Sequence, residues 1–102
     1  MNATNPDGTW TDDFLMWEAK LAVRVTGREL VDAARRLRRA LRVPDTATIG
    51  VVLGLADIKA ENNPIVATLR QQHIDASAAY FTAMVDLAEL DPSVDIRRLL
   101  PA

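Results

Sequence analysis

The sequence predicts an all-α protein, a compact bundle of four to five helices with one long helix in its C-terminal half. Apolar residues recur at spacings of three and four over most of the chain, and cap residues and prolines divide it into helix-length segments. With 102 residues, 49% hydrophobic and 25% charged, the composition is that of one globular domain. We therefore predict a flexible N-terminal tail at 1–10 and a single helical domain over 11–102.

The first helix is predicted over 12–25. Thr11 can cap it, and Asp12 and Asp13 follow at positions where the helix dipole favours negative charge. Apolar side chains then recur at helical spacing, as expected of an amphipathic helix. They are Phe14, Trp17, Leu21 and Val25.

A second helix is predicted to begin at Thr26. The segment Thr26-Gly27-Arg28-Glu29 fits the capping box, in which the hydroxyl and the carboxylate each bind a free backbone amide. The helix ends near Val43, because Pro44 disfavours helical geometry in the residue before it. Its apolar stripe comprises Leu30, Ala34, Leu37 and Leu41.

Residues 46–60 fit either a helix or a strand, because "TIGVVLGLA" (48–56) is apolar without a period. A strand here would pair with 20–25, which gives an alternative α+β fold with a small strand pair at 20–25 and 48–55. We favour a helix, since a two-stranded sheet is marginally stable and no third strand is evident in the sequence.

The long helix is predicted from Pro64 to about Leu90. Asn63 is a favourable cap residue, and proline suits the first helical position. Asp91-Pro92 repeats this pattern and predicts a short last helix that Pro101 ends.

The second helix carries a dense group of arginines on the side away from its leucines. Residues 20–42 contain eight Lys and Arg against two Asp and Glu, whereas the rest of the chain contains four against twelve. We predict that an acidic protein or subunit surface docks on this group, which comprises Arg28, Arg35, Arg36, Arg38, Arg39 and Arg42. A plain solvated face is one alternative. Nucleic acid is the other, and the isoelectric point of about 5.2 and the lack of aromatic residues among these arginines count against it.

Surplus apolar surface predicts a homo-oligomer. Gly50 and Gly54 form a small-xxx-small pattern, which lets two helix backbones approach closely, and the long helix is apolar on more than one side. The alternative is that these side chains pack within a single chain. The predicted oligomer interface comprises Trp10, Trp17, Gly50, Gly54, His73, Tyr80, Phe81 and Met84.

The sequence indicates no catalytic residue, no metal site and no cofactor. His73 is the one histidine, and its helix neighbours Ser77 and Asp75 cannot give it the geometry of a nucleophile, base and orienting group. A small helical enzyme with His73 in its site is therefore the least favoured class. Cysteine is absent from the sequence, which excludes thiolate chemistry and zinc sites with sulfur ligands.

We therefore predict a non-enzymatic protein–protein interaction module, with a nucleic-acid-binding regulator as the alternative. No basic and apolar leader is visible, and the longest apolar stretch, 49–56, is far shorter than the ~20 residues that cross a bilayer. We expect a cytoplasmic protein without a membrane partner. Ten arginines against two lysines indicate a bacterial or phage origin.

Overall fold

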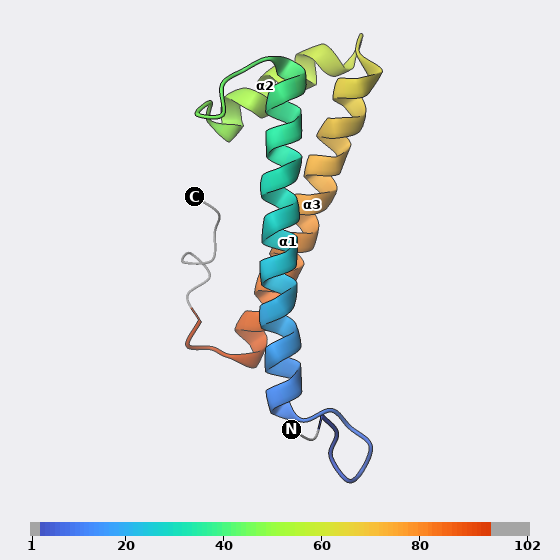
Figure 1. The fold of residues 1–102 in the computed structure, drawn as a ribbon, viewed down its shortest axis with the longest axis vertical. Helices are drawn as coiled ribbons and strands as arrows, with labels where there is room; N and C mark the ends of the chain where they lie inside the picture. The colour runs from blue at the N-terminus through green and yellow to red at the C-terminus, as the bar shows by residue number, and fades with distance from the viewer. Residues whose placement is uncertain (1–2, 95–102) are drawn as a thin grey trace. The chain divides into compact units, whose positions relative to one another are not determined.

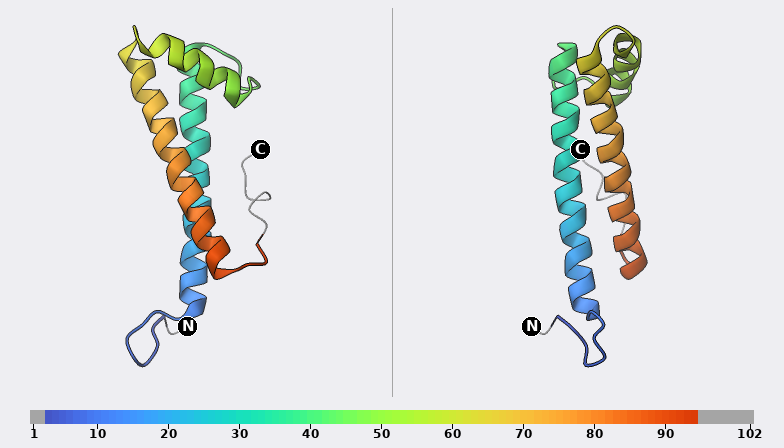
Figure 2. Two further views of the ribbon diagram at one scale, coloured as in Figure 1. Left: turned by 180° about the vertical axis from the view of Figure 1, so that it is seen from behind. Right: turned by 90° about the vertical axis from the view of Figure 1, so that its right-hand side faces the viewer.

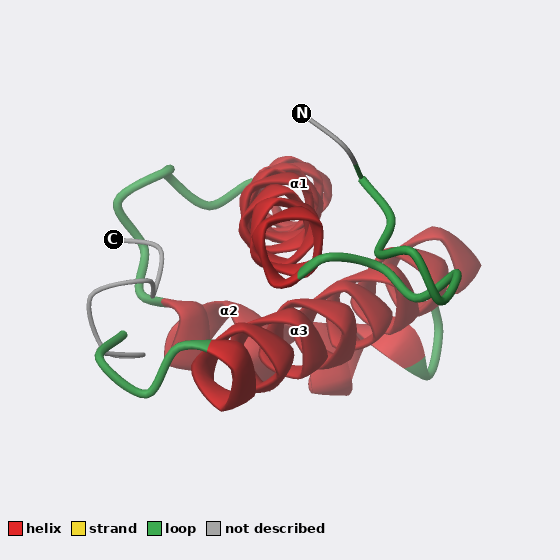
Figure 3. Cartoon of the chain, turned by 90° about the horizontal axis from the view of Figure 1, so that it is seen from below, coloured by secondary structure: helices red, strands yellow, loops and turns green. Residues whose placement is uncertain are grey.

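The computed structural model describes residues 3–94, and these residues form three α-helices joined by loops (Figure 1). The helices are α1 (Asp12–Leu41), α2 (Ile49–Ala60) and α3 (Pro64–Leu90). The predicted all-α class is confirmed, but four to five helices is wrong. The α+β alternative is also wrong, because residues 20–25 lie within α1, residues 49–55 lie within α2, and no strand occurs within residues 3–94 (Figure 3).

The helix boundary predicted at Thr26 is wrong because α1 continues through it. The Thr26 hydroxyl donates to the carbonyl oxygen of Ala22 at 2.6 Å and lies 3.3 Å from that of Val23. A threonine inside a helix can satisfy its hydroxyl on the preceding turn in this way, so it does not cap a new helix. The two helices predicted before Pro44 are therefore one helix of 30 residues.

The chain divides into two compact units, and both α1 and α3 contribute to each. Unit 1 comprises Met1–Gly27 and Ala79–Ala102, of which the structure describes 3–27 and 79–94. In it the N-terminal part of α1 packs against the C-terminal part of α3 (Figure 2). Its buried apolar side chains are Ala19, Val23, Tyr80, Ala83, Met84 and Leu87.

A close approach inside unit 1 explains Gly27. A Cβ atom added at Gly27 would lie 3.1 Å from Cε2 of Tyr80, which is closer than ordinary van der Waals contact. The glycine therefore admits the Tyr80 ring against the backbone of α1 and does not mark a helix end.

Hydrogen bonds organise the start of unit 1. The Thr11 hydroxyl accepts the Phe14 N–H at 3.2 Å, which confirms the predicted cap. In the loop before it, Asp7 accepts both the N–H and the hydroxyl of Thr9, and these bonds lower the pKa of Asp7.

Unit 2 (Arg28–Ala78) contains the C-terminal part of α1, all of α2 and the N-terminal part of α3. Within this unit α2 runs across the other two helices (Figures 1 and 2). All three helices supply the core of unit 2. Its buried members are Leu37, Leu41, Val52, Ala56 and Val66.

The ends of α3 follow the predicted pattern where the structure describes them. The side-chain oxygen of Asn63 accepts the N–H groups of Ile65 and Val66 at 3.1 and 3.3 Å, so the predicted cap and the predicted range of this helix are confirmed. After α3, the Asp91 carboxylate accepts the N–H and the hydroxyl of Ser93. Residues 91–94 form a turn, so the last helix predicted to begin at Asp91-Pro92 does not begin there, and its remaining residues, 95–102, lie outside the described residues.

We predict that Gly54→Ala stabilises the protein and that Gly27→Ala does not. Alanine in place of glycine inside a helix gains about 1 kcal/mol, and nothing lies within 4 Å of a Cβ atom added at Gly54. At Gly27 the same gain is offset by crowding against Tyr80. Urea unfolding of both variants measures the difference, and an equal gain at the two positions would contradict this account of Gly27.

Candidate functional site

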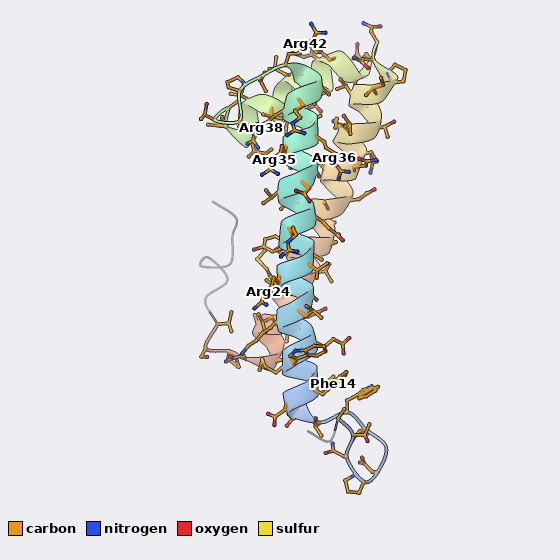
Figure 4. All side chains as sticks on the ribbon, in the orientation of Figure 1. Phe14, Arg24, Arg35, Arg36, Arg38 and Arg42 are labelled. Atoms are coloured by element: carbon orange, nitrogen blue, oxygen red, sulfur yellow. The ribbon has the colours of Figure 1, made fainter. Side chains whose placement is uncertain are left out.

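The C-terminal part of α1 presents one strongly basic surface. We name as the arginine surface the five exposed side chains of Arg28, Arg35, Arg36, Arg39 and Arg42. They emerge from unit 2, and Figure 4 labels three of them on the last turns of α1. The leucines of the same helix segment face inward, since Leu37 and Leu41 belong to the core of unit 2. The apolar and basic residues of this amphipathic helix thus lie on separate sides.

The arginine surface has little internal charge compensation. Its one ion pair within residues 3–94 joins Nη1 of Arg35 to Oδ1 of Asp32 at 3.6 Å, and both side chains are about half exposed. Such an exposed pair contributes between nothing and about 1 kcal/mol. The other ion pair in this part of the chain links Arg70 to Asp57, and neither residue belongs to the arginine surface. Four of the five guanidinium groups therefore have no carboxylate partner among the described residues.

Arg38 has a different role from the one predicted for it. Its Nε and Nη2 atoms both donate to the carbonyl oxygen of Ala47, at 3.1 and 2.9 Å. This bidentate contact fixes the loop between α1 and α2 from a partly buried position. Because its guanidinium group is used inside unit 2, Arg38 is not part of the arginine surface.

Arg42 ends α1 in a backbone conformation that arginine rarely adopts. Its φ is 58°, its N–H donates to the carbonyl oxygen of Arg39, and the Val43 N–H donates to that of Arg38, each at 3.1 Å. This is the Schellman arrangement, in which glycine is the usual residue because a Cβ atom costs about 1–2 kcal/mol there. An arginine at this position thus adds a cation to the arginine surface at the expense of backbone energy.

His73 is buried in unit 2 and does not form a catalytic constellation. Burial, and then the positive charge of Arg38, lower the pKa of His73, and both effects favour the neutral imidazole. Asp75 accepts a hydrogen bond from Gln71 at 2.9 Å. Within residues 3–94 no hydrogen bond joins His73 to Ser77 or Asp75, and no group of three or more metal-ligating side chains occurs.

The predicted oligomer interface is partly buried and partly exposed. His73, Tyr80 and Met84 lie in the interior of their units, where burial also raises the pKa of Tyr80. Trp10 and Trp17 are more than half exposed, as is Phe81. Nothing lies within 4 Å of a Cβ atom added at Gly50 or Gly54, so no other part of the described chain packs closely on these glycines.

An aromatic cluster in unit 1 was not singled out from the sequence. The rings of Trp10 and Phe14 stack with their centroids 4.5 Å apart, and the Phe14 and Trp17 rings follow at 5.9 Å. Part of the signal for it is present in the sequence, because Phe14 and Trp17 are three residues apart on α1 and are therefore neighbours on the helix surface. Trp10 precedes α1, so its stacking on Phe14 depends on the loop before the helix. Figure 4 labels Phe14 at the start of α1.

No protein-family model matches the chain, and no curated protein or solved structure does either. Across residues 3–94, no helix combines the length and the apolar character needed to span a membrane.

We predict that Arg42→Gly raises the free energy of unfolding by about 1 kcal/mol, because glycine relieves the strain of a positive φ. The matched control is Arg39→Gly, which places glycine inside the helix and lowers stability by about 1 kcal/mol. Urea unfolding measures both variants. A loss of stability in Arg42→Gly similar to that in Arg39→Gly would show that Arg42 is not strained.

Proposed function

We propose that the protein is a non-enzymatic protein–protein interaction module that forms homo-oligomers and docks an acidic partner surface through its arginine surface. The observation that carries the proposal is the group of exposed guanidinium groups, four of which lack a carboxylate within residues 3–94. Like charges so close on one helix repel one another, and an acidic surface that settles against them removes this repulsion.

The chemistry of arginine supports a carboxylate-bearing partner. A guanidinium group is planar and always charged, and it can bind a carboxylate through two parallel hydrogen bonds. Of the ten arginines, five are gathered on this surface, and the chain has two lysines in total. The surface is therefore suited to oriented contacts and not just to diffuse attraction.

The surroundings of the arginine surface favour protein over nucleic acid. Unit 2 contains no Phe, Trp or Tyr, so it offers no aromatic ring on which a base could stack. The chain is also acidic overall, with a formal net charge of −2. A binding test must therefore distinguish a nucleic-acid partner from an acidic protein partner.

Exposed apolar side chains support self-association. On α2, Val51 is 55% and Ile58 71% exposed, and on α1 Trp17 is 58% exposed. A helix as uniformly apolar as α2 is normally covered on all sides. We also propose a cytoplasmic location and, from the excess of arginine over lysine, a bacterial or phage origin.

We predict that the Arg36→Gln/Arg39→Gln/Arg42→Gln variant binds poly-L-glutamate at least about tenfold more weakly than the wild type, a loss of ~1.4 kcal/mol or more. The loss follows from removing unpaired cations, and fluorescence anisotropy of labelled poly-L-glutamate measures it. The control Arg24→Gln/Lys59→Gln removes two cations elsewhere and should bind almost as the wild type does.

Duplex DNA and single-stranded RNA of matched charge are measured in parallel. Weaker binding of both nucleic acids than of poly-L-glutamate supports an acidic protein partner. Tighter binding of either nucleic acid would contradict that partner chemistry, and equal poly-L-glutamate binding by the triple variant would contradict a role for the arginine surface.

A further inference from the structure

The two units differ in the sign of their charge. Unit 2 carries eight Lys and Arg against six Asp and Glu. The described part of unit 1, residues 3–27 and 79–94, carries two against seven. Both ion pairs found within residues 3–94 lie inside unit 2, so the described carboxylates of unit 1 are not used in ion pairs there.

Part of this acidic charge lies beside the aromatic cluster. We name as the aromatic–acidic surface the side chains of Trp10, Asp13, Phe14, Trp17 and Glu18. The carboxylates of Asp13 and Glu18 are exposed, and Trp10 and Trp17 are 52% and 58% exposed. Asp13 and Trp17 are one helical turn apart, as are Phe14 and Glu18, so acids and rings alternate along the start of α1.

We infer that the arginine surface of one copy docks on the aromatic–acidic surface of a second copy of this chain. The inference rests on the proposed function, because it names the acidic partner of the same arginine surface. The partner is thus unit 1 of another molecule, and the protein assembles with itself through unlike surfaces.

The chemistry of the two surfaces is complementary. A guanidinium group can stack on the face of an indole or phenyl ring while its N–H groups bind a neighbouring carboxylate. The aromatic–acidic surface supplies both kinds of contact side by side. A lysine ammonium can also lie over a ring, but it lacks the planar group that stacks on a ring while two of its N–H groups bind a carboxylate, so this surface suits arginine better than lysine.

The second copy is the partner that the charge distribution favours. Every copy carries both surfaces, so the complementary surface is present at the same concentration as the arginine surface. Contact covers aromatic side chains that are more than half exposed, of about 150–250 Å² each, and adds apolar burial to the charge pairing.

The test is a charge-reversal experiment on the full chain, read as mass in solution by sedimentation equilibrium. One variant, Arg36→Glu/Arg39→Glu, reverses the arginine surface. The other, Asp13→Arg/Glu18→Arg, reverses the aromatic–acidic surface. Circular dichroism checks that each variant keeps its helices. The control, Lys59→Glu/Asn62→Asp/Gln72→Glu, changes the charge of unit 2 by the same amount at exposed positions away from the arginine surface.

We expect the wild type and the control to have a mass that is a multiple of 11.2 kDa. Each reversed variant alone should associate at least about tenfold more weakly, and an equimolar mixture of the two should regain the wild-type mass because opposite charges meet again. Association should also weaken as salt is raised from ~0.01 M to ~1 M.

Three results would overturn the inference. They are a wild type of 11.2 kDa at every concentration, a reversed variant that associates like the wild type, and a mixture that stays as weak as its components. A wild type of 11.2 kDa at every concentration would also remove homo-oligomer formation from the proposed function. Docking of an acidic surface is tested separately by the binding of poly-L-glutamate. A monomeric wild type that binds poly-L-glutamate through its arginine surface would therefore keep the docking role and exclude a second copy as the partner.

Discussion

The main constraint on this molecule is electrostatic: the turns of α1 from Arg28 onward, with Arg42 directly after them, hold five exposed arginines, and one of these is paired with a carboxylate within residues 3–94. The inward side of the same turns is fixed by burial, because Leu37 and Leu41 are enclosed by residues of α2 and α3. The hydrophobic effect therefore decides which way the segment faces, and the arginines must face outward. Their mutual repulsion is the physical basis of the proposed docking.

Two arginines at the end of α1, Arg38 and Arg42, have different roles. Arg38 is turned into unit 2, where it binds the Ala47 carbonyl oxygen and lies close enough to His73 to lower its pKa. Arg42 is held at a positive φ by the turn that ends the helix. One arginine therefore stabilises the loop, whereas the other occupies a position where glycine would be more stable. Retaining a charged residue at a strained position is the pattern found at functional sites.

The sequence predicted a helix end correctly where a side chain at that end caps the helix. Thr11 and Asn63 cap their helices through their own side chains, so the beginnings of α1 and α3 followed from sequence. Thr26-Gly27 carried the same local signal, yet α1 continues through it: the Thr26 hydroxyl binds the preceding turn, and Gly27 leaves room for the ring of Tyr80, which is distant in sequence. The roles of Arg38 and Tyr80 could not be predicted for the same reason, since both depend on contacts between segments far apart in the chain.

The central claim is that the guanidinium groups of the arginine surface are not used to stabilise their own chain. The most direct measurement is the free energy of unfolding of Arg28→Gln/Arg36→Gln by urea, at low protein concentration. Both positions lie before the last turn of α1, so the helix dipole contributes little to the result. The account predicts a value within about 0.5 kcal/mol of the wild type, or above it at low salt as repulsion is relieved. A loss of more than about 1 kcal/mol would show that these groups already bind carboxylates of their own chain, and the docking surface would not exist.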